Sequence, residues 1–366
     1  MKKILAFHLY NDYSGSPKVL RQTLGGLARA GYDIALCTSR GGVLDGLRGE
    51  GVDICHFNYR FSSFRPLTFL RLVRSELFMM LYGLRHGSRD SIFFVNTLLP
   101  TLAAVAGRLR GARVVYHYHE NAFVKSMMYR SKAWCMKRLA NEIICVSDYQ
   151  KDMLNAKGNA VVLPNALPDS FRVRLTPDAE AAFMRRNVLF VGSLKIYKGI
   201  LDFIDLARAC PDINFTAVLS ASREEIDAFV ANFEVDVPSN LTMHPRQEDT
   251  VPFYNNASVV VNLSNRSMVL ETFGLTIIEA MADGLPVVVP VSGGIAELVE
   301  DGKNGWHIDS QDMGRLKGTI ENILNDKGLY MRLSANAISM SKKYDETQYF
   351  AKMCVIIENG CHDNGY

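Results

Sequence analysis

The chain has 366 residues, of which 48% are hydrophobic and 22% charged, and its formal net charge is +3 at pH 7. This balance is that of ordinary globular proteins and excludes a disordered or fibrous chain, and the length predicts two domains. No run reaches the ~18–20 apolar residues of a membrane-spanning helix. The apolar run after Lys3 breaks at His8 and Asp12, too early for a secretory signal.

The cysteines and acidic residues give no sign of a metal or disulfide framework. There is no C-x-x-C pair and no Asp-x-Asp pair, so we expect no bound metal and a reducing, cytoplasmic location. The seven cysteines are scattered, at positions 37, 55, 135, 145, 210, 354 and 361.

The charge is divided unevenly between the two halves of the chain. Residues 1–168 hold 23 Lys and Arg against 11 Asp and Glu, a net charge of +12, whereas residues 169–366 carry −9. The first half therefore suits an anionic partner. The alternative is that the two surfaces differ in composition without a partner being involved.

The N-terminal third predicts a strand at 3–9, a loop, a helix at 17–30 and a strand at 33–38. This order is that of a Rossmann-like unit. The G-x-G-x-x-G fingerprint is absent, which argues against a dinucleotide cofactor.

Two stretches, 60–89 and 122–140, mix basic residues with large apolar ones. For 60–89 we expect most of the stretch to pack as a core helix, and the alternative is that its basic fringe lies on an anionic membrane surface. Nucleic acid is not expected, because no recognition motif accompanies the charge.

Strands are predicted at 91–96 and 113–118 around a helix at 100–109, and a further strand at 142–146 precedes the cap residue Ser147. The strand at 113–118 is followed by His119 and Glu120. Open α/β sheets place ligand-binding residues at the carboxyl ends of such strands, so His119 is a candidate. The alternative is a histidine with a structural role only.

The second half repeats this order, with a strand at 187–192, a glycine-ended loop at Lys198, a helix at 200–210 and a strand at 214–220. A lysine beside a helix start is unfavourable unless an anion is bound, so Lys198 is a candidate anion ligand. A short helix is expected at 248–255, a strand at 259–264, and helices at 311–324, 329–344 and 346–359.

Two carboxylates eight positions apart, Glu271 and Glu279, flank the expected start of a helix at 276–283. Backbone N–H groups at 273–276 would point out of that helix start and offer an anion site. Phosphate bound there, with a carboxylate on either side for sugar hydroxyls, suits a nucleotide diphosphate-sugar. The alternative is a surface helix with two ordinary glutamates. Residues 291–297 read as a second glycine loop opening a helix, and 301–306 as a turn.

Residues 259–308 resemble the C-terminal half of the retaining GT-B glycosyltransferases of family 4, which carry an E-x7-E pair. The resemblance extends to 161–169 and to Lys198-Gly199, and is weaker before residue 110. The loop at 14–20 resembles the family loop that touches the donor phosphate, with Ser14 in place of a glycine and Pro17 in place of the acidic residue. Ser193 stands where the family has an arginine.

This resemblance implies a GT-B fold, in which two Rossmann-like domains face each other across a cleft and a C-terminal helix crosses back to the first domain. The implied domains are 1–168 on the acceptor side and 185–345 on the donor side, with 346–366 as the returning helix and a linker at about 165–185. The implied activity is sugar transfer from a nucleotide-sugar to a glycan or lipid-linked acceptor, with retention, in surface polysaccharide synthesis.

The resemblance also implies roles for individual residues. Glu271 would hold the donor sugar, Glu279 the ribose, and His119 would bind the sugar or assist proton movement. Lys198 would stabilise the leaving diphosphate. The remaining donor-binding candidates are Phe273, Gly274, Leu275, Gly15, Ser193, Lys195 and Gly294.

Two other functions fit the same motifs. One is a GT-B epimerase acting on the nucleotide-sugar itself, and the other is a non-catalytic GT-B subunit that binds a partner. In each case we expect no cofactor and no metal. The location expected is the cytoplasm, with the inner face of the membrane as a peripheral site.

Overall fold

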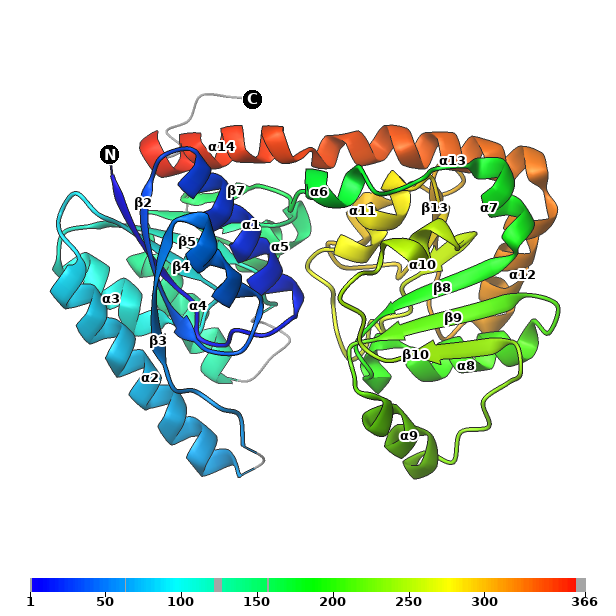
Figure 1. Cartoon of the computed structure of the whole chain (residues 1–366), viewed down its shortest axis with the longest axis horizontal. Helices are drawn as coiled ribbons and strands as arrows, with labels where there is room; N and C mark the ends of the chain where they lie inside the picture. The colour runs from blue at the N-terminus through cyan, green and yellow to red at the C-terminus, as the bar shows by residue number, and fades with distance from the viewer. Residues whose placement is uncertain (1, 63, 122–126, 157, 360–366) are drawn as a thin grey trace. The chain divides into compact units, whose positions relative to one another are not determined.

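The computed structural model describes residues 2–62, 64–121, 127–156 and 158–359, and these form two compact units. Unit 1 comprises residues 1–165 and 347–366, and unit 2 comprises residues 166–346. Each unit is a parallel sheet with helices between its strands (Figure 1). The chain returns to unit 1 through its last helix, α14 (Glu346–Asn359), drawn in red.

Within its described residues, unit 1 has a seven-stranded sheet in the order β3-β2-β1-β4-β5-β6-β7. The chain builds outward from β1 on one side and from β4 on the other, so the strand order reverses between them. Ligands bind at such reversals in open α/β sheets. The strands are β1 (Lys3–Phe7), β2 (Asp33–Ser39), β3 (Val52–Phe57), β4 (Ile92–Asn96), β5 (Arg113–Tyr118), β6 (Glu142–Cys145) and β7 (Ala160–Val162).

The helices of unit 1 follow the strands in alternation, as the sequence predicts for a Rossmann-like unit. They cover both faces of the sheet, so the central strands are almost wholly apolar and buried. The helical segments are α1 (Gly15–Arg29), η1 (Val43–Glu50), α2 (Arg65–His86), α3 (Thr101–Leu109), α4 (Met127–Leu139), α5 (Asp148–Leu154) and α14.

Unit 2 has a six-stranded sheet among its described residues, in the order β10-β9-β8-β11-β12-β13, which reverses between β8 and β11. The strands are β8 (Asn187–Gly192), β9 (Asn214–Leu219), β10 (Leu241–His244), β11 (Val259–Val261), β12 (Val287–Val289) and β13 (Gly305–His307). The helical segments are α6 (Asp169–Arg172), α7 (Ala179–Arg185), η2 (Ile196–Lys198), α8 (Ile200–Ala209), α9 (Arg223–Asn232), α10 (Val251–Asn255), α11 (Leu275–Ala282), η3 (Ala296–Leu298), α12 (Met313–Asn325), α13 (Lys327–Ser341) and η4 (Lys342–Tyr344).

The returning helix α14 is fastened to unit 1 along its length. The ring of Phe350 packs over Gly26 of α1, and the hydroxyl of Tyr349 lies 2.7 Å from that of Thr23. At the other end, the Arg113 guanidinium donates to the carbonyls of Ile356 and Ile357, at 2.7 and 2.8 Å. A cation at the carboxyl end of a helix also interacts favourably with the helix dipole.

The turn expected at 301–306 is present at 302–304, and the edge strand β13 (Gly305–His307) follows it directly. Two other expectations about local structure are wrong. Residues 291–297 lead into the single 3-10 turn η3 rather than into a full helix. The stretch 165–185, expected as a linker, contains α6 and α7, and Leu175 and Ala182 there are buried in the core of unit 2.

The stretch 60–89 differs most from its expected core helix. Its helix α2 buries only Leu72, Ser75, Glu76, Met79 and Gly83. The other basic stretch, 122–140, forms α4 from Met127 onward, and residues 122–126 lie outside the described part. Among the described residues, no helix combines the length and the apolar character needed to span a bilayer.

Candidate active site

The donor-side candidates of unit 2 gather where its strand order reverses. The loop after β8 leads through η2 to Lys198, and the chain after neighbouring β11 leads through Ser264 to Glu271. Gly199 allows the two loops to approach, because a Cβ at this position would lie 2.2 Å from the carbonyl oxygen of Leu263. Its φ of +86° also lies in the region that favours glycine.

The two candidates Lys198 and Glu271 form an ion pair within this site, between Nζ and Oε1. The hydroxyl of Ser264 donates to the same carboxylate oxygen, at 2.9 Å. Both charged side chains are largely buried, which strengthens their interaction relative to an exposed pair. The residue expected to bind the diphosphate and the residue expected to bind the sugar are therefore in direct contact.

The backbone of Glu271 is fixed by the glycine loop at 293–294. The N–H of Gly294 donates to the carbonyl oxygen of Glu271, at 2.7 Å. A Cβ on Gly293, whose φ is +102°, would lie 2.7 Å from that carbonyl oxygen. The Gly294 N–H was expected to face the diphosphate, but it is engaged in orienting Glu271 instead.

The expected helix start is present, and α11 begins at Leu275 with Gly274 as its N-cap residue. The first N–H groups of a helix have no acceptor within it, so those of Leu275 and Thr276 point out of this end. The Phe273 ring packs edge-on against Tyr344, with centroids 5.8 Å apart, which fixes the chain just before the helix. This geometry suits an anion.

Glu279 lies one turn into α11, where Tyr254 of α10 contacts it. The Tyr254 hydroxyl donates to Oε2 of Glu279 at 2.5 Å, and burial raises the pKa of this tyrosine well above 10. Tyr254 therefore remains a proton donor and orients the carboxylate. Neither Tyr254 nor Ser264 was predicted as a site residue from the sequence, because neither stands in a motif that marks its contact with a glutamate.

The remaining unit 2 candidates, Ser193 and Lys195, lie in the loop that precedes Lys198. The carbonyl of Ser193 accepts from the N–H of Lys195, at 2.8 Å, and the Lys195 side chain is exposed. Among the described residues, Lys198 rather than Lys195 is the ion-pair partner of Glu271.

In unit 1, His119 follows β5, the strand beside β4, and its side chain reaches the end of β4 at the reversal of strand order. Its Nε2 is 3.0 Å from Oδ1 of Asn96, the last residue of β4. The Asn96 amide nitrogen lies 3.0 Å from Nδ1 of His8, which follows β1. His8 Nε2 lies 2.9 Å from the carbonyl oxygen of Tyr10. His8 and Asn96 were not predicted as site residues, since neither stands in a motif.

Burial keeps these histidines neutral near pH 7. It lowers the pKa of His8 from 6.5 to about 4 and that of His117 to about 3. The pKa of His119 also falls well below 6.5, chiefly through burial and then through His117 and His8. The ring of His117 lies 4.1 Å from that of His119 between centroids. Within the described structure, both ring nitrogens of His117 are buried without a hydrogen-bond partner.

The last unit 1 candidate, Gly15, is the first residue of α1, which is long enough to carry a helix dipole. The preceding Ser14 does not cap the helix with its side chain. Its hydroxyl donates instead to Oδ1 of Asp12, at 2.6 Å. The Asn96 amide nitrogen also reaches the first turn of α1, at 3.4 Å from the carbonyl oxygen of Ser16.

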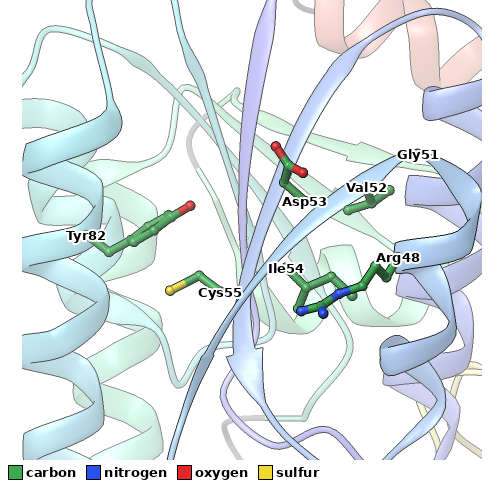
Figure 2. Close-up of a pocket in the computed structure, with 7 residues that line it drawn as sticks. All are labelled: Arg48, Gly51, Val52, Asp53, Ile54, Cys55 and Tyr82. Carbon is green, nitrogen blue, oxygen red and sulfur yellow. The ribbon is translucent and has the colours of Figure 1, made fainter.

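A hollow of about 430 Å³ lies away from these candidates, at the edge strand β3 (Figure 2). It is lined by Cys55, Tyr82, Arg48 and neighbouring residues of β3, and holds none of the predicted site residues. Cys55 is the register partner of Cys37, so the two thiols share one face of the sheet. A hydrogen bond between them lowers the pKa of Cys55 to about 7.

Two family models match the chain, one for each half. Residues 13–171 match the model described as Glycosyltransferase Family 4, and residues 178–340 match Glycosyl transferases group 1. Together the matches include both groups of candidate residues. The chain therefore belongs to the group 1, family 4 type of glycosyltransferases, as its motifs predicted.

Among its relatives, an uncharacterised glycosyltransferase of Haemophilus influenzae is 25% identical over 362 residues, covering 94% of this chain and 96% of the relative. A D-inositol 3-phosphate glycosyltransferase of Acidothermus cellulolyticus is 35% identical over 216 residues. That match spans 50% of this chain and 47% of the relative, about half of each protein.

Solved structures of similar fold confirm the predicted GT-B architecture. Anabaena HepE, crystallised with UDP and glucose, matches with a TM-score of 0.78 and 19% identity, covering 98% of this chain and 100% of HepE. Sucrose-phosphate synthase of Thermosynechococcus elongatus matches with a TM-score of 0.78 and 19% identity, covering 97% and 98%. At these identities the likeness establishes the fold and not the substrate.

Proposed function

We propose that this glycosyltransferase moves a sugar from a nucleotide-sugar donor to a glycan or lipid-linked acceptor, with retention of configuration. The observation that carries the proposal is the Lys198–Glu271 ion pair beside the start of α11. It combines a cation, a carboxylate and outward backbone N–H groups, which are the groups that a diphosphate linked to a sugar requires. HepE, with the same fold, has been crystallised with UDP-glucose.

In the proposed reaction, the bond between C1 of the sugar and the β-phosphate oxygen breaks, and its electron pair stays on the phosphate. The acceptor hydroxyl oxygen forms the new bond to C1, and its proton passes to the phosphate oxygen that has left C1. Negative charge therefore grows on the diphosphate as the reaction proceeds. Lys198 and the N–H groups at the start of α11 would stabilise that charge without a metal ion, because both are already oriented.

The other residues take the roles that their contacts support. Glu271, oriented by Ser264 and by the N–H of Gly294, would accept hydrogen bonds from the donor sugar. Glu279, oriented by Tyr254, would accept them from the ribose hydroxyls. In unit 1, the N–H groups at Gly15 would contact phosphate and His119 the sugar.

The test begins with the nucleotide. Thermal shift against a panel of UDP, GDP, ADP, dTDP and CMP sugars selects a donor, which is then incubated with and without candidate acceptors in the presence of EDTA. Transfer to an acceptor with retained anomeric configuration, read by NMR, supports the proposal. An epimerised donor in the absence of acceptor would instead identify an epimerase, and binding without chemistry would identify a non-catalytic subunit.

We further propose that the acceptor is lipid-linked and that α2 brings the enzyme to an anionic membrane. The outward face of α2 repeats every four residues, yet it carries large apolar side chains where a surface helix is usually polar. Phe69, Leu70 and Leu81 are exposed to 60%, 64% and 66%. Val73, Leu77 and Phe78 are exposed beside them.

The charges on this face favour a lipid surface over a second copy of the chain. Its exposed residues include Arg65, Arg74 and Arg85 and no acidic residue. A face of this kind would repel its own copy but attract anionic lipid, with about 1 kcal/mol from each Lys or Arg near the surface. On α4, Met127 and Trp134 are also exposed, and Arg138 stacks on the Trp134 ring. Exposed apolar side chains flanked by basic ones are typical of helices that lie in a membrane interface.

Liposome flotation tests this placement. We expect the protein to float with vesicles containing phosphatidylglycerol at low salt, to float less at high salt, and to remain behind with neutral vesicles. Leu70→Glu and Leu77→Glu together should abolish flotation. The matched control is Met184→Glu, at an exposed apolar residue of unit 2. Failure of the wild type to float on any vesicle, or a stable dimer in its place, would overturn the membrane proposal.

A further inference from the structure

The hydrogen bonds around His119 form a connected series, and at one end of this series the donor and the acceptor are known. The Tyr10 carbonyl oxygen can only accept, so Nε2 of His8 must carry the proton in the 2.9 Å contact between them. Nδ1 of the neutral His8 is then an acceptor, and it receives a hydrogen from the Asn96 amide nitrogen at 3.0 Å. This contact decides which end of the Asn96 side chain is the nitrogen.

The orientation of Asn96 then determines the protonation of His119. With its amide nitrogen toward His8 and the Ser16 carbonyl, Asn96 presents only Oδ1 to His119, at 3.0 Å. An amide oxygen accepts and does not donate, so Nε2 of His119 carries the proton. A neutral His119 is then the Nε2–H tautomer. The Tyr10 carbonyl oxygen determines this tautomer through the side chains of His8 and Asn96.

The backbone beside Asn96 is strained in a way that supports this arrangement. Thr97 has a φ of +72°, which is costly for a β-branched residue. The turn at Thr97 ends β4 at Asn96 and directs the N–H of Leu98 to the carboxylate of Glu120, at 3.2 Å. Glu120 follows His119 directly, so the strained turn ties the two strand ends together.

We propose that His8 and Asn96 are positioning residues that hold His119 as its neutral Nε2–H tautomer, and that this is the form active in transfer. The second clause rests on the proposed function. In glycosyl transfer the sugar ring becomes positively charged in the transition state. An imidazolium beside that ring would oppose the reaction, whereas a neutral imidazole does not.

The groups around His119 favour the neutral form. The ring of His117 lies beside that of His119, tilted by 47°, and His8 lies beyond Asn96. Both histidines become cations when protonated, and both lower the pKa of His119. The carboxylate of Glu120 is engaged by the Leu98 N–H. Asp12 raises the pKa of His8 only slightly against the effect of burial.

The test replaces the amide by a carboxylate of the same shape. Long-range ¹H–¹⁵N correlation spectra of the full histidine-labelled chain, assigned with His119→Gln, should show wild-type His119 as neutral Nε2–H from pH 8 to pH 5. In Asn96→Asp, the carboxylate accepts from Nε2 and stabilises the imidazolium, so the pKa of His119 should rise by one unit or more. The matched control, Asn58→Asp, places the same charge at an exposed position in unit 1.

The kinetic arm separates positioning from a merely structural role. If the raised pKa is near 6.5, about a tenth of His119 is neutral at pH 5.5, so kcat/KM of Asn96→Asp should fall about tenfold from pH 7.5 to pH 5.5 relative to wild type. An Nδ1–H tautomer in the wild type, or an unchanged His119 titration in Asn96→Asp, would overturn the network. The spectra need no donor, so the expected tautomer together with an absence of transfer would reject the proposed function alone.

Discussion

Lys198 and Glu271 are 73 residues apart in the sequence and in contact in the folded unit. The motif around each residue predicts a ligand contact, but neither motif predicts that the two residues bind each other. A diphosphate that enters the site must therefore compete with Glu271 for Lys198 or bind beside the pair. Lys198 is thus held in place by Glu271 rather than extending freely from the surface.

We predict that Lys198→Ala lowers kcat by 10²- to 10³-fold, the usual effect of removing one group that stabilises transition-state charge. The midpoint of thermal unfolding should change little by comparison. Steady-state kinetics with the donor found by the thermal-shift panel measures the effect. Lys195→Ala is the matched control, an exposed lysine in the same loop, and should retain near-normal turnover. A reversal of the two results would move the role to Lys195.

For Glu279 we predict weaker nucleotide binding rather than slower chemistry. Loss of a hydrogen bond to a charged group costs about 1.5–3 kcal/mol, so Glu279→Ala should weaken nucleoside diphosphate affinity roughly 10- to 100-fold. Tyr254→Phe should weaken it by less, because the carboxylate remains but loses the hydroxyl that orients it. Isothermal titration calorimetry gives both values. Wild-type affinity in Glu279→Ala would exclude the residue from the site.

The sequence identifies the residues that carry motifs and misses those that support them. Glu271, Glu279 and Lys198 stand beside glycines or helix starts whose backbone chemistry can be read directly. Ser264, Tyr254, His8 and Asn96 contribute through side-chain contacts that no motif predicts. Asn96 reaches His8 because β4 pairs with β1, a pairing between strands about 90 residues apart.

At the level of elements, the buried strands and long amphipathic helices are predictable and the edge strands are not. The runs at β4, β5 and β12 are mostly apolar and almost wholly buried because helices cover both of their faces. The edge strands β3, β10 and β13 include exposed polar residues or a turn-like sequence, so their composition resembles that of loops. The burial of helix α2 was predicted wrongly, because an apolar face indicates that something covers the helix but does not show whether the rest of the chain does so.

The contact between α1 and α14 gives a prediction in which adjacent glycines behave oppositely. An alanine normally stabilises a helix by up to about 1 kcal/mol relative to glycine. At Gly26 the added Cβ would lie 2.0 Å from the Phe350 ring, so Gly26→Ala should instead destabilise unit 1 by about 1–3 kcal/mol. Hydrogen exchange of the α14 amides should show the loss directly.

Gly25→Ala is the control for this change. Its Cβ would lie 2.5 Å from Oε2 of Glu50 and 3.5 Å from Nη1 of Arg29, and side-chain ends of this kind can move aside. In Gly25→Ala we expect the α14 amides to be protected from hydrogen exchange as well as in the wild type, or slightly better. Equal loss of protection in both variants would mean that helix α1, and not its contact with Phe350, accounts for the effect.

For the whole molecule, the two units should respond to acid in opposite directions. In unit 1, burial lowers the pKa values of His8, His117 and His119, so the unfolded chain binds more protons below pH 6.5 and stability is lost as pH falls toward the folded values. In unit 2, burial raises the pKa of Asp283 to about 6. The contribution of Asp283 is present at low pH and is lost as pH rises through about 4 to 6.

We therefore predict that hydrogen-exchange protection of unit 1, corrected for intrinsic rates, decreases between pH 6.5 and pH 5 while that of unit 2 does not. Each histidine that stays neutral contributes about 1.4 kcal/mol per pH unit. His117→Leu removes one such group together with its two unpartnered ring nitrogens, so unit 1 of this variant should be about 2 kcal/mol more stable relative to wild type at pH 5 than at pH 7. The same pH dependence in His117→Leu and wild type would show that His117 is protonated in the folded state, and that the unpartnered histidine is not the acid-sensitive element of unit 1.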